Sequence, residues 1–333
     1  MEKELKEADF YKQKRSKMVE CLLCSHRCLI NEGGVGICRA RKNINGKLFS
    51  LVYGQAVAMN LDPIEKKPLY HFLPGSDTLS FGTLGCNFHC QNCHNYQISQ
   101  AEVDTDNSFT SPAEIIEMAV NTKASSISYT YNEPTIFFEY ALETMKLAQA
   151  KGLKNVWVSN GYISKKALKE LLPYLDAINI DLKSMDKDFY QKVCGAKPGP
   201  IIDNIKYLSK SKVHLEITTL IIPTLTDSLP NLKKIAKFIA GLNRDIPWHI
   251  SRFSPEISWK LKELPPTNEW KMEKAHKAGR DVGLKYVYSS FGEENTRCPK
   301  CGQVNIKRFY YDVERSDDQG KCRRCGQDLK MIL

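Results

Sequence analysis

The sequence TLSFGTLGCNFHCQNC, residues 78–93, joins an apolar predicted strand (78–84) to a loop with three cysteines. Cys86, Cys90 and Cys93 have the spacing C-x3-C-x2-C. Protein cysteines usually ligate all four irons of a [4Fe–4S] cluster. Because this loop offers three thiolates and no fourth cysteine stands nearby in the sequence, we interpret it as a [4Fe–4S] site with one open iron. The alternative is a zinc or structural cluster site whose fourth ligand is remote.

Strand–helix units repeat along the chain from this loop onward. Further apolar strands are predicted at 125–131, 154–160, 176–182, 213–222 and 247–253, with a late strand at 284–290. Ser111 is expected to cap a helix that has Pro112 at its first position, and Thr267 to cap the last helix. The other helices are predicted at 134–151, 164–174, 187–193, 201–211, 229–241 and 267–282.

Six consecutive units of this kind are typical of a parallel sheet covered by helices. A complete eight-unit barrel needs ~250 residues, and only six units fall within residues 78–292. We therefore predict an α/β fold with a partial (β/α)6 barrel at 76–292. Residues 1–75 are expected to form a Cys-rich N-terminal extension, and residues 293–333 a small metal-binding module. Loops after the carboxyl ends of barrel strands build the active site.

The N-terminal extension is predicted to contain an exposed polar helix (4–18) and an extended segment (47–75). Four cysteines within 18 residues suggest one closed metal site between them, formed by Cys21, Cys24, Cys28 and Cys38. Their uneven spacing leaves a second, auxiliary iron–sulfur cluster and zinc equally open, and His26 is a candidate substitute ligand. The plainer alternative is a structural staple for residues 20–45.

The C-terminal module has two C-x2-C-G turns, formed by Cys298 and Cys301 and by Cys322 and Cys325. Such turns are typical of zinc ribbons and rubredoxin-like sites, in which four thiolates make a tetrahedron. Zinc and iron both fit; zinc would be structural, and iron could relay electrons. Cys194 stands alone and is predicted to be a buried structural thiol, with a substrate-facing or redox thiol as the alternative.

Composition narrows the class of protein. No run approaches the ~20 apolar residues of a membrane helix, and the charged start lacks the apolar core of a signal peptide. We therefore expect a cytoplasmic protein with no membrane partner, in which metal ligation is favoured over disulfides. The net charge of +10 could attract nucleic acid or phosphorylated substrates, but the scattered lysines favour a solvated surface.

Many segments in one order resemble a known family. They are CLLCSHRC with GGVGICRAR (21–41), LDPIEKKPLYHFLPGS (61–76), TLGCNFHCQNCHN (83–95), TYNEP (130–134), VSNGY (158–162), NIDLK (179–183), WHISRFSP (248–255), NTRCPKCG (295–302) and CRRCG (322–326). With them the chain resembles the AmmeMemoRadiSam-system radical S-adenosylmethionine (SAM) enzymes, relatives of the pyruvate formate-lyase activating enzymes. The resemblance implies that SAM binds the open iron, and that one electron cleaves it to methionine and a 5′-deoxyadenosyl radical, which abstracts hydrogen.

The resemblance also implies which residues contact SAM. Phe88 would shield the cluster and contact adenine, and Thr218 would approach adenine from the fifth strand. Asn132, Glu133 and Pro134 stand where relatives carry a segment that pairs with the SAM amino group.

The ends of the third and fourth strands complete the implied SAM site. Ser159 and Asn160 are expected near the ribose and carboxylate. Lys183 would pair with the SAM carboxylate, and Asp181 with a hydroxyl or a substrate amine.

No catalytic residue is predicted beyond the cluster, but His94, His249 and Arg252 are candidates to face the substrate. His94 directly follows a cluster ligand and, like Tyr96 and Ser25, departs from the usual family residues, which are Gln, Trp and Pro at these three positions. This departure leaves the substrate open. Arg252 suits a carboxylate or phosphate, whereas the alternative for His249 is a core histidine.

Three functions follow from these patterns. The first is a radical SAM enzyme that acts on an unidentified small molecule or protein, with electrons from a donor such as ferredoxin or flavodoxin. The second is an activase that makes a glycyl or other radical on a protein partner. The third, which leaves the central loop unexplained, is a metal-stabilised nucleic-acid-binding protein.

Overall fold

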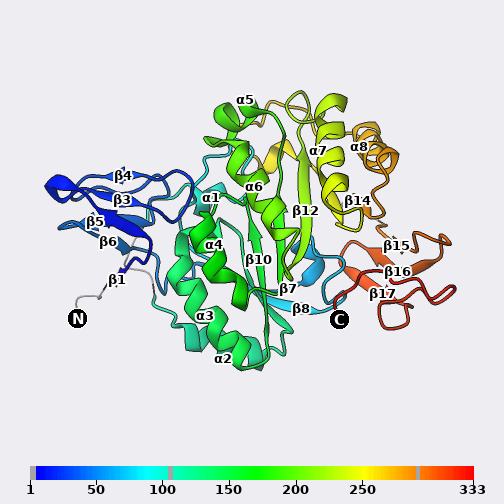
Figure 1. Cartoon of the computed structure of the whole chain (residues 1–333), viewed down its shortest axis with the longest axis horizontal. Helices are drawn as coiled ribbons and strands as arrows, with labels where there is room; N and C mark the ends of the chain where they lie inside the picture. The colour runs from blue at the N-terminus through cyan, green and yellow to red at the C-terminus, as the bar shows by residue number, and fades with distance from the viewer. Residues whose placement is uncertain (1–4, 104–107, 290–292) are drawn as a thin grey trace.

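The computed structural model describes residues 5–103, 108–289 and 293–333. Its centre is an eight-stranded sheet with the order β14-β13-β12-β11-β10-β9-β8-β7 (Figure 1). Neighbouring strands from β8 to β14 run parallel, whereas β7 pairs antiparallel with β8. The strands are β7 (Ala58–Pro63), β8 (Asp77–Gly82), β9 (Ser126–Tyr129), β10 (Lys154–Ser159), β11 (Ala177–Asp181), β12 (His214–Ile221), β13 (Trp248–Arg252) and β14 (Val287–Ser289).

Helices connect the parallel strands and cover one face of the sheet, which confirms the predicted partial barrel (Figure 1). Within the described ranges, no helix is both long and apolar enough to cross a membrane. The α-helices are α1 (Tyr96–Ser99), α2 (Pro112–Asn121), α3 (Phe138–Ala150), α4 (Lys165–Leu171), α5 (Lys187–Phe189), α6 (Pro198–Leu208), α7 (Leu229–Leu242) and α8 (Glu269–Asp281). Shorter helical turns are η1 (Arg15–Lys17), η2 (Ile64–Lys66), η3 (Pro134–Phe137), η4 (Leu172–Tyr174), η6 (Pro255–Ile257) and the π-helical turn η5 (Tyr190–Cys194).

Helix starts follow the sequence signals with one correction. Ser111 caps α2 through a capping box with Glu114, as predicted. The cap of α8 is Asn268, whose side chain accepts from the Lys271 N–H, and the prediction of Thr267 was wrong by one residue. Thr267 is occupied elsewhere, because its hydroxyl accepts from the Phe253 N–H at 2.8 Å and donates to the Ile221 carbonyl.

The predicted N-terminal helix does not form. The described part of 4–18 contains β1 (Lys6–Glu7) and β2 (Tyr11–Gln13), which pair with strands farther along the chain. Tertiary pairing therefore overrides the helix propensity of this polar segment. Two small sheets result, β1-β6-β5 and β2-β3-β4, completed by β3 (Val19–Cys21), β4 (Leu29–Ile30), β5 (Arg41–Ile44) and β6 (Lys47–Ser50).

The extended segment before the barrel joins the barrel itself. β7 adds to the central sheet, although it lies in the region expected as an N-terminal extension. Residues 64–73, which we call the plug segment, then cross the inner face of the sheet, where Ile64, Leu69 and Phe72 pack against Val156 and Ala177. The sheet is thereby covered on both faces, as parallel sheets require.

The C-terminal module is a separate three-stranded sheet that holds the plug segment in place. Its strands are β15 (Thr296–Arg297), β16 (Val304–Phe309) and β17 (Asp312–Arg315). The Arg308 guanidinium donates to the Tyr70 carbonyl at 2.6 Å, and His71 bonds the Leu329 carbonyl at 3.0 Å. The Ile332 N–H donates to the His71 carbonyl at 2.8 Å. These contacts join segments that lie more than 230 residues apart.

One buried ion pair fastens the N-terminal sheets to the barrel. Arg41 on β5 donates both terminal nitrogens to the two carboxylate oxygens of Glu139 on α3, at 2.9 and 2.6 Å. Both side chains are 1% exposed. Burial raises the pKa of Glu139, but the Arg41 charge outweighs burial and leaves the pKa below its usual value. The pair therefore stays ionised inside the protein.

Removing one partner of this pair should destabilise the fold strongly. We expect Glu139→Ala to lower the free energy of unfolding by about 3–5 kcal/mol, because Arg41 is left buried without its counter-charge. The matched control is Glu143→Ala one turn later on α3, whose carboxylate is 47% exposed and pairs with Lys6 at 3.6 Å. That change should cost less than about 1 kcal/mol. Denaturant unfolding measures both, and equal losses would contradict the assignment.

Candidate metal and cofactor site

The three-cysteine loop leaves the carboxyl end of β8, where the barrel places its chemistry. Two glycines let it turn there. A Cβ atom on Gly85 would lie 2.4 Å from the Cys38 carbonyl oxygen, and Gly85 has a φ of +91°. A Cβ atom on Gly82 would lie 2.5 Å from the Thr130 carbonyl oxygen. The loop can approach its neighbours this closely only with glycine at both positions.

The thiols of the loop are held in a dry environment. Burial, and next the negative charge of Glu133, raise the pKa of Cys86 well above its usual value. Burial also raises the pKa of Cys93. Thiolates in such a place need a positive partner, and a bound metal supplies one. The three thiols therefore fit a metal cluster.

Glu133 lies at the end of β9 and is fully engaged by protein donors. Its carboxylate accepts from the Thr135 N–H at 3.1 Å, from the Ser159 hydroxyl at 2.8 Å and from the Asn160 N–H at 2.7 Å. The residue is 1% exposed, and burial raises its pKa. Glu133 thus fixes the ends of β9 and β10 relative to each other.

Two asparagines tie the cluster loop to these strand ends. The Asn132 amide donates to the carbonyls of Thr83 and Gly85, at 2.8 and 2.7 Å. The Asn160 amide donates to the side-chain oxygen of Asn87 at 2.7 Å. Asn87 directly follows Cys86 and was not among the predicted site residues. Its position inside the motif was the available signal.

Asp181 and Lys183 meet at the end of β11. The Lys183 ammonium lies 2.7 Å from the Asp181 carboxylate. Burial lowers the pKa of Lys183, but Asp181 and the neighbouring thiols of Cys90 and Cys194 outweigh burial and raise the pKa. Lys183 is therefore a cation beside the cluster loop.

Cys194 is fully buried, as predicted, but its neighbour was not foreseen. It ends the π-helical turn η5 and contacts Cys90 of the three-cysteine loop, and this contact together with burial raises the pKa of Cys90. The His89 N–H donates to the Cys194 carbonyl at 3.0 Å, and the Gln91 N–H to the Val193 carbonyl at 2.9 Å. The η5 turn, which follows β11 in the chain, is thus hydrogen-bonded to the three-cysteine loop.

The other residues predicted to contact SAM or substrate lie in different environments. Phe88 is buried and packs edge-on against Tyr162, while His94 is exposed beside the loop. Pro134 begins η3 and is buried. Thr218 donates its hydroxyl to the Asn179 side chain at 2.9 Å, which turns it toward the barrel interior.

His249 belongs to a buried network and does not reach solvent at the barrel mouth. Its Nε2 lies 2.5 Å from the Glu216 carboxylate, and both side chains are 0% exposed. Glu216 also accepts from the N–H groups of Tyr70 and His71 in the plug segment. The structure therefore agrees with the alternative for His249, a core histidine, because the plug segment covers that part of the sheet.

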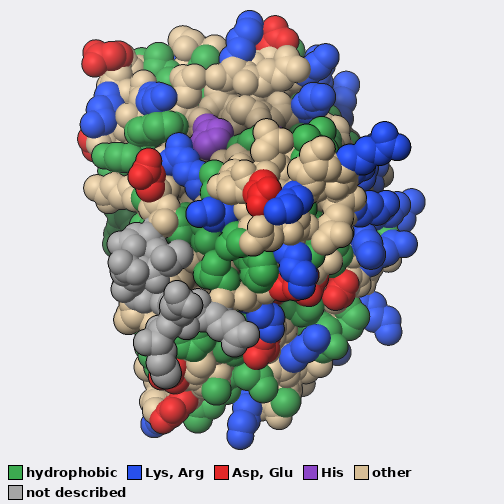
Figure 2. Space-filling view, turned by 90° about the vertical axis from the view of Figure 1, so that its left-hand side faces the viewer, with side chains coloured by type: hydrophobic (Ala, Val, Ile, Leu, Met, Phe, Trp, Pro, Cys, Tyr) green, Lys and Arg blue, Asp and Glu red, His purple; other side chains and the backbone are tan. Residues whose placement is uncertain are grey.

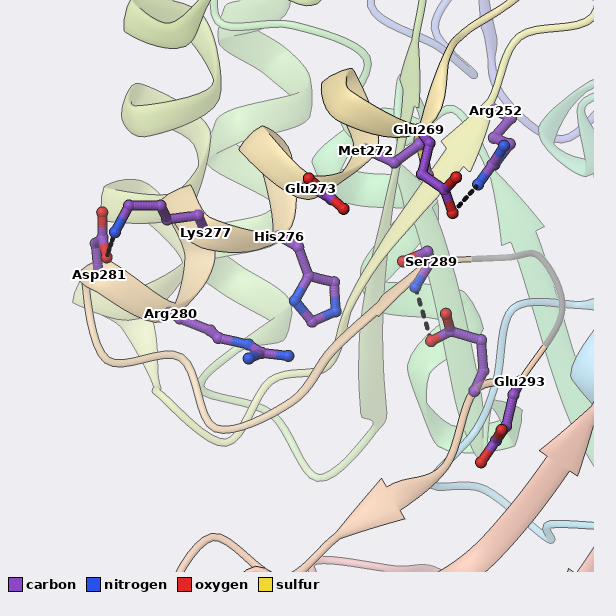
Figure 3. A pocket seen from close by; sticks show the side chains of 11 residues that line it. Arg252, Glu269, Met272, Glu273, His276, Lys277, Arg280, Asp281, Ser289 and Glu293 are labelled. Atoms are coloured by element: carbon purple, nitrogen blue, oxygen red, sulfur yellow. Dashed lines mark hydrogen bonds and ion pairs between the residues drawn. The ribbon is translucent and has the colours of Figure 1, made fainter.

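Arg252 lies in a surface groove between α8 and the ends of β13 and β14 (Figure 3). Its guanidinium approaches Glu269 at 4.0 Å. Burial raises the pKa of Glu294, which also lines the groove, to about 7. The groove carries both signs of charge, so it has no single preference for anions.

The two flanking cysteine sets differ in geometry. The Sγ atoms of Cys298, Cys301, Cys322 and Cys325 all lie within 4.8 Å of one another. Cys21, Cys24, Cys28 and Cys38 instead line an enclosed cavity. In the described part of the chain, the C-terminal set is the only His, Cys, Asp and Glu group close enough to hold one metal ion.

Comparisons with known proteins agree with this geometry. The radical SAM superfamily matches residues 81–238. An uncharacterized protein of Methanocaldococcus jannaschii is 38% identical over 99% of this chain and 100% of its own length. A second protein of that organism, provisionally named a glycyl-radical enzyme activating enzyme, is 33% identical over 54% of this chain and 68% of its length.

More distant proteins support the same fold. The pyruvate formate-lyase-activating enzyme of Clostridium pasteurianum is 24% identical over 51% of this chain and 71% of its length. The structure of Streptococcus suis SuiB bound to S-adenosylmethionine has a TM-score of 0.50 at 13% identity, over 66% of this chain and 50% of that one. The chain therefore belongs to the radical SAM superfamily and is related to the pyruvate formate-lyase-activating enzymes.

Proposed function

We propose that Cys86, Cys90 and Cys93 hold the [4Fe–4S] cluster on which this radical SAM enzyme cleaves SAM. The main support is that Asn132, Asn160 and Lys183, which follow the ends of β9, β10 and β11, all contact or lie beside the three-cysteine loop. The cofactor supplies the reductive cleavage, and the chain binds SAM, orients it and excludes water. The nucleic-acid-binding alternative has no comparable support.

The polar groups around the loop divide into contact residues and positioning residues. Lys183 and Asp181 offer opposite charges to the carboxylate and ammonium of the SAM methionine moiety. Ser159, Asn160 and Thr218 would lie along the nucleoside, with Phe88 as an apolar wall for adenine. Glu133 positions Ser159 and Asn160, because its carboxylate accepts hydrogen bonds from both of them and from Thr135. Asn132 and Pro134 fix the same turn.

The proposed substrate is a protein or peptide, on which the radical is formed. Relatives named as activating enzymes support this choice over a small molecule. His94, exposed beside the loop, and Arg252 in the groove at the strand ends would face such a partner. A low-potential carrier such as ferredoxin or flavodoxin would supply the electron.

The flanking cysteine sets are proposed as additional metal sites. The C-terminal set would hold one zinc or iron ion, and it stabilises the module that fixes the plug segment. The N-terminal set would hold an auxiliary iron–sulfur cluster or zinc. On this proposal the chain has a Cys-rich region at each end of the barrel domain.

Loss of one cluster ligand should abolish the reaction. After anaerobic reconstitution with iron and sulfide, then dithionite and SAM, the wild type should form 5′-deoxyadenosine and methionine. Cys86→Ala should yield neither above background, because the open-iron cluster cannot assemble on two thiolates. The matched control is Gln97→Ala on the exposed side of α1, which should retain activity. Chromatographic detection of 5′-deoxyadenosine decides it; activity in Cys86→Ala equal to wild type would sink the proposal.

Lys183 should contribute to SAM binding. A hydrogen bond to a charged group contributes about 1.5–3 kcal/mol, so Lys183→Met should weaken SAM binding by about 10–100-fold. The control is Lys192→Met, whose side chain is 77% exposed in the neighbouring η5 turn, and it should bind SAM like the wild type. Equilibrium binding of SAM to the reconstituted proteins measures both, and equal affinities in all three would refute the role.

A further inference from the structure

The N-terminal cysteines enclose a shared interior. Cys21, Cys24, Cys28 and Cys38 line one cavity, together with the apolar side chains Leu23, Ile30, Ile37 and Ile136. The Cys21 N–H donates to the Cys28 carbonyl at 2.9 Å, so the first and third cysteines are fixed across a narrow strand pair. We call this arrangement the N-terminal cage.

The cage differs from the C-terminal site in width. Two thiolates on one zinc ion, each at about 2.3 Å, lie about 3.8 Å apart in a tetrahedron. The C-terminal thiols already match this spacing, with two Sγ pairs at 3.6 Å. In the residues that the structure describes, the cage thiols do not gather as closely. Thiolates on four different irons of a cubane are farther apart than ligands of one ion, so four thiols arranged around a cavity favour a cluster.

The charge balance of the cage also calls for metal. The Cys21 side chain is buried, and Cys24, Cys28 and Cys38 are only partly exposed. The nearest cation is Arg41, which also lines the cavity, but its charge is already matched by Glu139. Four thiolates could therefore form in this apolar interior only around bound metal ions.

The cage directly adjoins the central cluster loop. Asn87, the residue after Cys86, lines the cavity, and its carbonyl lies 2.7 Å from His26 Nε2. The Cys38 carbonyl packs so closely on Gly85 that a Cβ atom there would be 2.4 Å away. Short backbone segments thus separate the cage from the three-cysteine loop.

The other side of the cage meets solvent through an apolar and basic surface. Leu29, Val35 and Ile37, next to Cys28 and Cys38, are 66%, 50% and 43% exposed. Residues 5–50 contain ten Lys and Arg but four Asp and Glu. Figure 2 shows this side of the molecule, where Lys and Arg predominate over Asp and Glu. Such a surface is complementary to an acidic protein.

We propose that the N-terminal cage holds a second [4Fe–4S] cluster, ligated on all four irons by Cys21, Cys24, Cys28 and Cys38, and relays electrons. An acidic low-potential carrier loses one electron to this cluster, which then returns to its oxidised form as the central cluster is reduced. No bond is made or broken and no proton moves. The relay step rests on the proposed function, whereas the presence of the second cluster does not.

The first experiment isolates the second cluster in the full chain. Cys86→Ala/Cys90→Ala/Cys93→Ala, reconstituted anaerobically, should retain one complement of iron and acid-labile sulfide. After reduction it should give a cluster electron paramagnetic resonance signal that SAM does not alter. Adding Cys24→Ser/Cys38→Ser should remove both. Iron at the C-terminal site would carry no sulfide, so sulfide reports the cage alone.

Absence of acid-labile sulfide from the folded triple variant would overturn the proposal, because zinc or iron at the intact C-terminal site accounts for metal without sulfide. Circular dichroism establishes whether each variant folds. If the triple variant does not fold, the sulfide difference between wild type and Cys24→Ser/Cys38→Ser decides the same question: a loss of one cluster supports the proposal, and no loss refutes it.

The second experiment tests the relay. SAM cleavage is driven by reduced flavodoxin or by dithionite, and the ratio of the two rates is compared between wild type and Cys24→Ser/Cys38→Ser. In the variant, the ratio of the flavodoxin-driven rate to the dithionite-driven rate should fall to the value obtained when flavodoxin is omitted. An unchanged ratio would overturn the relay. If the wild type cleaves no SAM with either reductant, the proposed function fails while the sulfide result still stands.

Discussion

The buried carboxylate of Glu133 is the constraint on which the site depends. A polar group buried this deeply needs hydrogen-bond partners. Its oxygens accept from Thr135, Ser159 and Asn160, which lie at or after the ends of β9 and β10. Asn160 then reaches Asn87 in the cluster loop, and Asn87 reaches His26 beside the N-terminal cage. A single chain of hydrogen bonds therefore places the strand ends, the central thiols and the cage relative to one another.

Two further polar contacts hold the outer parts of the molecule on the barrel. Arg41 and Glu139 join the N-terminal sheets to α3, and Arg308 joins the C-terminal module to the plug segment. Glu216, on the inner face of the sheet, accepts from two N–H groups of the plug segment and also contacts His249 of β13. Because each contact is buried, the partial barrel is closed by neighbours that are far away in the sequence.

In the three cysteine sets, the spacing of the cysteines and the packing around them together determine the size of each site. Two C-x2-C-G turns bring four thiols close enough for one ion. The central loop places three thiols beside Lys183 and Cys194. The N-terminal cage keeps its thiols around an apolar cavity. The same ligand atom thus serves sites of different size, because the backbone around it differs.

Local features were determined by the sequence itself. The order of strands and helices, the cap Ser111 and the ligand loop after β8 follow from periodicity and spacing within a few residues. Tertiary structure decided the rest: β1 and β2 in place of a helix, the plug segment on the inner face, Cys194 against Cys90, and His249 turned toward Glu216. These depend on contacts between residues far apart in the chain, whose partners are fixed only when the elements pack, and no local pattern specifies them.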